Sequence, residues 1–244
     1  MEKVKMKENK IIQLTPILHI KTRPGMYIGG TSEIEEEKLM FNPTIKTFEY
    51  RKVRYVPGLL KIINEIFDNS FDEYIRTNGK FANKIDVAIT NSSVSITDNG
   101  RGVPQENNEK GIPQAVIAFT EPFAGTNFVD ETKALASIGM NGVGSVATNV
   151  FSKYFNVHTY NGKTHLMLIC KNNVTEIKYD ITKSKNKNGT EVYFEPDFDL
   201  FDVDSLSSEY VDLIRNRIIH LAKQFDIEFI LKYDTNEENI NDLF

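Results

Sequence analysis

The chain is 244 residues long, which is enough for one large domain with short extensions. Hydrophobic residues make up 40% and charged residues 26%, the balance of an ordinary soluble globular protein. The formal net charge of −5 argues against this segment being a main nucleic-acid-binding surface, which would normally be basic. Cys170 is the single cysteine, so no internal disulfide can form, and no apolar run is long enough for a membrane span. These features predict a cytosolic protein.

The first 56 residues carry few regular patterns. Residues 1–30 form a charged arm that ends in Thr22-Arg-Pro-Gly-Met-Tyr-Ile-Gly29, where the Pro-Gly pair predicts a loop. Residues 31–56 are acidic at first and then mixed, and no element is predicted for them.

Residues 57–76 are predicted to form a helix with a broad apolar face and one polar stripe. The stripe consists of Glu65, Asp68, Asn69 and Asp72, at spacings of three and four residues. Three carboxylates in a row repel one another unless a positive group lies among them. A solvated helix face is the simpler interpretation. In the alternative, the stripe faces a metal-nucleotide, with Asn69 as a ligand of Mg²⁺ and Glu65 as a general base.

The next two alternating runs, Lys84–Thr90 and Val94–Asp98, predict a hairpin that ends in Asp98-Asn-Gly-Arg-Gly-Val-Pro104. A carboxylate at a strand end can accept a hydrogen bond from an exocyclic amine, a contact that guanine cannot reproduce. Gly100 and Gly102 would let the backbone approach a flat base closely. A plain turn is the simpler interpretation of this motif.

A glycine-rich loop, Gly139-Met-Asn-Gly-Val-Gly144, follows a predicted helix at 112–119 and leads into another at 145–152. Backbone N–H groups of such a loop can surround anionic oxygens, and a helix N-terminus adds a favourable dipole. The sequence contains no G-x-x-x-x-G-K-[ST], which excludes the commonest class of ATPase.

The second half is richer in strand patterns. We expect a helix at 205–224 and strands at 155–160, 164–170, 174–179, 190–195 and 227–233. The tail after residue 233 is acidic and poorly periodic. This order predicts an α+β fold, a two-layer sandwich in which helices cover one face of a mixed, mostly antiparallel sheet.

Taken in order, an E-x-x-D-N helix, a D-x-G-x-G turn, a G-x-x-G-x-G loop and the strand start Gly189-Thr190 resemble the four motifs of the gyrase, chaperone, histidine-kinase and MutL ATPase superfamily. Arg23-Pro-Gly-Met-Tyr-Ile-Gly29 and Glu65-Ile-Phe-Asp-Asn-Ser-Phe-Asp-Glu73 are similar to the gyrase B and topoisomerase II branch. The resemblance covers roughly residues 10 to 235 and implies a Bergerat-type ATP-binding fold. A chaperone or mismatch-repair branch is the alternative, and the arm motif argues against it.

The resemblance also implies roles for single residues. Glu65 would be the general base and Asn69 the protein ligand of Mg²⁺, while Asp98 would bind the adenine amino group with help from Thr190 through water. The remaining nucleotide-binding residues would be Arg101, Gly102 and Pro104 beside the adenine, and Gly139, Asn141, Gly142, Val143 and Gly144 in the phosphate lid. Tyr27 lies in the arm motif that, in this family, reaches the nucleotide pocket of the dimer partner. Asn141 stands where bacterial gyrases have His, as in the eukaryotic and tailed-phage enzymes, so the large subunit of a tailed-phage type enzyme is one expectation.

The expected function is binding and hydrolysis of Mg-ATP by the ATPase domain of a type II DNA topoisomerase. Residues 1–30 would be a dimerisation arm, residues 31–235 the ATP-binding domain, and residues 236–244 the start of a linker to a transducer domain. ATP and Mg²⁺ are the expected cofactors. The expected partners are a second copy, double-stranded DNA through the full-length enzyme, and another topoisomerase subunit or a C-terminal region, with no membrane.

ATP-driven dimerisation would close a gate for the passage of double-stranded DNA, in the cytoplasm or, for a phage-encoded enzyme, in the host cytoplasm. The alternative is an ATP-gated dimerisation module with negligible turnover of its own. This second interpretation follows from the resemblance, because the transducer domain of the family supplies a lysine to the γ-phosphate.

Overall fold

The computed structural model describes residues 13–123, 142–185 and 187–243. The predicted lid residues Gly139 and Asn141 lie outside these ranges. No helix among the described residues is long and apolar enough to cross a membrane.

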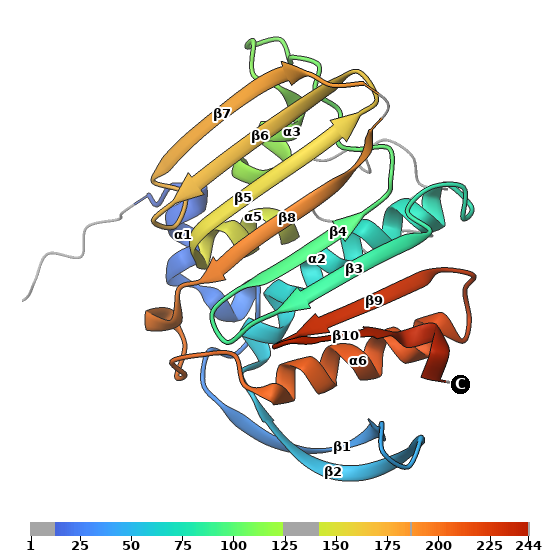
Figure 1. Cartoon of the computed structure of the whole chain (residues 1–244). Helices are drawn as coiled ribbons and strands as arrows, with labels where there is room; N and C mark the ends of the chain where they lie inside the picture. Colours follow the sequence, from blue (N-terminus) through green and yellow to red (C-terminus); the bar gives the residue numbers. More distant parts are fainter. Residues whose placement is uncertain (1–12, 124–141, 186, 244) are drawn as a thin grey trace, which may run out of the picture.

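One layer of the molecule is an eight-stranded sheet with the strand order β10-β9-β3-β4-β8-β5-β6-β7 (Figure 1). Neighbouring strands are antiparallel except β3 and β9, which run parallel. The strands are β3 (Lys84–Ile89), β4 (Val94–Asp98), β5 (Ser152–Asn161), β6 (Thr164–Lys171), β7 (Glu176–Lys183), β8 (Asn188–Pro196), β9 (Glu228–Tyr233) and β10 (Asn236–Asn239).

The second layer consists of helices on one face of this sheet (Figure 1). They are α1 (Pro16–Thr22), α2 (Pro57–Arg76), α3 (Gln114–Thr120), α5 (Gly144–Val150) and α6 (Ser208–Ala222). The core lies between the layers: Ile62 and Ile63 of α2 are fully buried, as are Ile85 and Val87 on alternate positions of β3. The predicted two-layer α+β fold is therefore confirmed.

The arm contains a helix, α1, that was not predicted from the sequence. Thr15 caps α1 by accepting a hydrogen bond from the N–H of Leu18 (3.3 Å), and Pro16 occupies the first turn, where its missing N–H costs nothing. A 3₁₀ turn, Pro24–Met26, follows directly. Ile20, fully buried, anchors this segment to the domain.

Residues 31–56, for which no element was predicted, form a separate two-stranded sheet of β1 (Ile34–Asn42) and β2 (Thr47–Tyr55). This hairpin packs against α6 at one end of the molecule (Figure 1). The side chain of Asn216 on α6 bonds to the backbone of β1, accepting from the N–H of Phe41 (3.0 Å) and donating to the carbonyl of Leu39 (3.1 Å).

The acidic tail also belongs to the packed fold. Residues Asn236–Asn239 form β10 at one edge of the large sheet, and a 3₁₀ turn, Ile240–Leu243, follows with Ile240 fully buried. The sequence pattern missed this strand because it is short and polar. The division into arm, ATP-binding domain and linker remains a prediction.

Candidate ATP-binding site

The predicted base and metal ligand lie one turn apart on α2 and meet the N-terminal end of α5. The side-chain amide of Asn69 donates to the hydroxyl of Ser145 at 2.9 Å. Gly144 lies so close to Glu65 that a Cβ at this position would overlap the Glu65 carboxylate. Glu65 and Asn69 are thereby placed beside the described end of the predicted lid, Gly142-Val143-Gly144.

Lys61 supplies a positive charge beside this site. It lies one turn before Glu65 on α2 and forms an ion pair with its carboxylate. Lys61 was missed in the sequence, although its spacing of four residues from Glu65 was a signal that could have found it. Lys61, a residue of the same helix, therefore partly offsets the repulsion expected among the carboxylates of the polar stripe.

Asp68 of the same stripe contacts α6. It is 5% exposed and forms an ion pair with Arg217 of α6. Burial raises the pKa of the Asp68 carboxyl to about 6, although the nearby Arg217 lowers it. Asp72 is also buried, at 9% exposure, so the interpretation of the stripe as a solvated face was wrong for these two residues.

Asp98 lies at the end of β4, directly opposite Thr190 of β8. Its carboxylate accepts hydrogen bonds from the Ser70 hydroxyl and from the N–H of Gly100, each at 2.8 Å. Burial raises the pKa of Asp98, while the bonds from Ser70, Gly100 and the Thr190 backbone oppose the rise. Ser70 was missed in the sequence, although it directly follows Asn69 in the motif.

The turn after Asp98 is anchored to α2 by a salt bridge. Arg101 donates to Glu73 from Nε at 2.6 Å and from Nη2 at 3.1 Å. Burial alone would raise the pKa of Glu73, but hydrogen bonds from Arg101 and Arg76 outweigh it and hold the pKa below its usual value. The guanidinium of Arg101, predicted to line the adenine, is thus directed to Glu73.

The same turn packs against β5. Gly102 has a φ of +77°, and a Cβ there would overlap the carbonyl of Tyr160. Thr159 accepts the N–H of Val103 at 2.8 Å, and its hydroxyl lies 3.2 Å from that of Thr190. Thr159 was not predicted, and only its position in the folded sheet brings it to this site. Pro104, the last residue of the predicted motif, is exposed.

Tyr27 of the arm lies elsewhere in this chain. Its hydroxyl is 2.9 Å from Nδ1 of His19 on α1, and the two rings meet edge to face. The reach of Tyr27 into the pocket of a partner remains a prediction.

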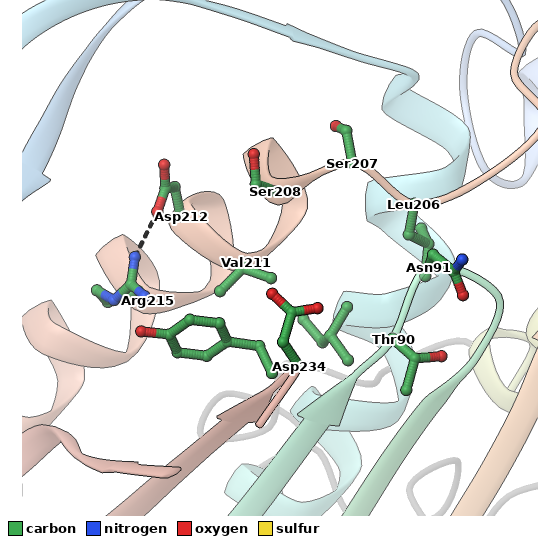
Figure 2. Close-up of a pocket in the computed structure, with 11 residues that line it drawn as sticks. Thr90, Asn91, Leu206, Ser207, Ser208, Val211, Asp212, Arg215 and Asp234 are labelled. Atoms are coloured by element: carbon green, nitrogen blue, oxygen red, sulfur yellow. Dashed lines mark hydrogen bonds and ion pairs between the residues drawn. The ribbon is translucent and has the colours of Figure 1, made fainter. Parts of the chain in front are cut away.

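A cavity of about 170 Å³ lies between the turn after β3, the start of α6 and the end of β9 (Figure 2). Asp212 and Arg215 form an ion pair in its wall. This volume is below the roughly 300 Å³ at which ordinary ligand pockets begin, and none of the predicted site residues lines it. We assign it no role in nucleotide binding.

The family of this chain follows from comparison with known proteins. A family model described as "Histidine kinase-, DNA gyrase B-, and HSP90-like ATPase" matches residues 55–200. The match covers more than half of the chain and contains α2, the Asp98 turn, Gly144 and Thr190. The chain belongs to this ATPase family.

Within the family, its relatives are type II topoisomerases. The DNA topoisomerase large subunit of Enterobacteria phage T4 is 43% identical over 229 residues, which cover 92% of this chain and 43% of that protein. DNA topoisomerase 2 of Penicillium chrysogenum is 32% identical over 221 residues, or 87% of this chain and 14% of that protein. The chain thus spans less than half the length of either relative.

The fold is also similar to that of a topoisomerase II ATPase region. The ATPase region of Saccharomyces cerevisiae topoisomerase II superposes with a TM-score of 0.83 at 25% identity, covering 94% of this chain and 62% of that one. The predicted resemblance to the ATPase domain of type II topoisomerases is therefore confirmed.

Proposed function

We propose that this chain binds Mg-ATP and hydrolyses it as the ATPase domain of a type II DNA topoisomerase. The observation that carries the proposal is the position of α2 between two clusters. Asn69 contacts Ser145 beside the glycine loop, and the adjacent Ser70 contacts Asp98 at the end of β4. One helix thus contacts both the cluster where the phosphates would bind and the cluster where the adenine would bind.

At the adenine end, Asp98 would accept a hydrogen bond from the exocyclic amino group. Ser70 and Gly100 hold the carboxylate in one orientation, so little ordering is needed when the base binds. Guanine presents a carbonyl at the corresponding position, and a carboxylate cannot pair with it. Adenine selectivity is the expected result.

At the phosphate end, Asn69 would bind Mg²⁺ together with phosphate oxygens and water. The contact with Ser145 uses the amide nitrogen of Asn69, and its carbonyl oxygen is the kind of hard ligand that Mg²⁺ prefers. Glu65, one turn away, would accept the proton of the attacking water. The close approach of Gly144 keeps this carboxylate beside the lid, where the γ-phosphate would lie.

The first experiment is calorimetry with a non-hydrolysable ATP analogue and Mg²⁺. We expect affinity in the micromolar range for the native chain, loss of binding in Asp98→Asn, and retained binding in Glu65→Gln. With ATP itself, Glu65→Gln should release no phosphate. Equal binding by the native chain and Asp98→Asn would place the adenine elsewhere. No binding by the native chain would refute the proposal.

A second candidate, an ATP-gated dimerisation module with negligible turnover, is favoured by one contact. Lys61 forms an ion pair with the Glu65 carboxylate. Glu65 could act as a base only if this carboxylate were available to accept a proton. Steady-state phosphate release that saturates with ATP would support the enzyme. Binding without release, together with release in Lys61→Met, would support the module.

In a longer parent enzyme, we infer that ATP binding would bring two copies together through residues 1–30, with Tyr27 reaching the partner. Hydrolysis would then drive passage of double-stranded DNA. The similarity to the phage T4 large subunit supports this part of the proposal. Crosslinking through a cysteine introduced at Tyr27, with and without the ATP analogue, would test it: a crosslink at Tyr27 that forms equally well without nucleotide would contradict the gate.

A further inference from the structure

β7 forms one edge of the large sheet, and all of its eight residues are exposed. Every second side chain is apolar: Ile177, Tyr179 and Ile181 are 45%, 46% and 39% exposed. An edge strand presents unpaired backbone N–H and C=O groups along its free side. A long edge with an apolar row is therefore a surface on which another strand can pair.

The apolar row of β7 continues the core side of the sheet. Leu166, opposite Ile181, and Leu168, opposite Tyr179, are fully buried. Ile177, Tyr179 and Ile181 consequently lie on the face that the helices cover further along the sheet. Another strand added at this edge would bury part of this row.

We propose that β7 pairs antiparallel with β7 of a second copy of this chain, so that the two large sheets join edge to edge about a two-fold axis. Such a contact is self-complementary, because each copy presents the same strand. It does not involve the nucleotide site, which lies at β4, α2 and α5.

The charges of β7 select one register for this pairing. In a two-fold antiparallel pair, residues of the same face lie opposite one another. Centring the pair on Tyr179 places Lys178 opposite Asp180 on both sides and Ile177 opposite Ile181. Opposite charges facing across two strands stabilise the pair.

The neighbouring registers place like charges together. Centring on Lys178 would put Lys178 opposite itself and Glu176 opposite Asp180, while centring on Asp180 would put that carboxylate opposite itself. The order of charges on β7 thus favours antiparallel pairing with a second copy of β7 in the register centred on Tyr179.

The other edge of the sheet is a much poorer partner. β10 has four residues, Asn236–Asn239, and the two in the middle are Glu237 and Glu238. Two copies of such a strand would bring carboxylates together, and the short edge offers few backbone groups. The joining edge is therefore β7.

The test measures self-association of the full chain without nucleotide by sedimentation velocity over a range of concentrations. We expect a reversible dimer in the native chain. Lys178→Asp and Asp180→Lys each turn attraction into repulsion at both symmetric positions, and each should raise the dissociation constant by about tenfold. Lys163→Asp makes the same charge change as Lys178→Asp, but in the exposed turn between β5 and β6, and should leave the dimer unchanged.

Two further samples distinguish a specific strand pair from a general effect of charge. The double variant Lys178→Asp/Asp180→Lys keeps opposite charges facing each other and should dimerise like the native chain. An equimolar mixture of the two single variants should recover a dimer of one copy of each. A monomeric native chain, single variants that dimerise normally, or a mixture that does not recover the dimer would overturn the proposal.

This outcome is separate from that of the proposed function. Calorimetry with the ATP analogue on Lys178→Asp and Asp180→Lys should give the native affinity, because β6, β5 and β8 separate β7 from Asp98 on β4. Loss of nucleotide binding in these variants would overturn the assignment of the edge as a separate surface.

Discussion

Glu65 depends on a glycine for its position. A Cβ at Gly144 would overlap its carboxylate, and the carboxylate would have to rotate away because it is the more flexible partner. A base displaced by about 1 Å loses on the order of 100-fold in rate. We therefore expect Gly144→Ala to lower ATP turnover by about 100-fold and to weaken binding of the ATP analogue by only a few-fold.

The matched control for this prediction is Gly30→Ala, where an added Cβ meets no atom within 4 Å. Phosphate release and calorimetry on both variants check it. Normal turnover in Gly144→Ala would show that Glu65 tolerates a shift and is not the base.

Asp68 gives the protein a specific response to pH. Its pKa of about 6 in the folded chain exceeds the roughly 3.9 of an unfolded aspartate. Between these values the folded state holds a proton that the unfolded state lacks, so the contribution of this group to the free energy of unfolding rises as the pH falls. The native chain should gain about 1 kcal/mol between pH 7 and pH 5 relative to Asp68→Asn.

Urea unfolding of both chains at the two pH values measures this difference, and all other titrating groups cancel in the comparison. Parallel changes in the two chains would mean that Arg217 keeps Asp68 ionised throughout this range.

At the scale of elements, the β1–β2 hairpin depends on α6 for its position. The amide of Asn216 satisfies one N–H and one carbonyl of β1, at Phe41 and Leu39. Asn216→Ala should reduce the free energy of unfolding by about 1–2 kcal/mol, since two hydrogen bonds to backbone groups are lost.

Hydrogen exchange locates the effect of this substitution. The amide of Phe41 should lose protection. The amides of β3 and β4 should exchange faster only to the extent that the global free energy of unfolding is reduced. Asn236→Ala, at an exposed position of β10, serves as the control. Unchanged protection at Phe41 would show that contacts other than Asn216 hold the hairpin.

At the scale of the whole molecule, a nucleotide that contacts α2, β4 and the lid should stabilise the entire domain. An ATP analogue with Mg²⁺ at about 100 times its dissociation constant adds roughly 2.7 kcal/mol to the free energy of unfolding. For a domain of this size, that raises the thermal midpoint by about 5–10 °C. Mg²⁺ alone and Asp98→Asn with the analogue should show almost no shift; an equal shift in Asp98→Asn would contradict the adenine contact.

Several regular elements could be predicted from local patterns in the sequence, whereas α1, β1, β2 and β10 could not. The helix predicted at 57–76 matches α2, Pro57–Arg76, because a first-turn proline and a repeating apolar face are both local signals. The hairpin of β3 and β4 was also predicted, from the alternation of apolar and polar residues and from the turn residues between the two strands. Glu65, Asn69 and Asp98 could be proposed from the sequence because their motifs lie within short stretches of chain.

Which of these residues contact one another depends on the packing of distant segments. Asp68 is buried and not solvated because Arg217, far along the chain, lies beside it in the fold. Thr159 reaches Val103 and Thr190 only because β5 and β8 are neighbours in the sheet. Local preferences depend on adjacent residues and can be read from sequence patterns. The choice of partner depends on packing between segments distant in the chain, and no short pattern records it.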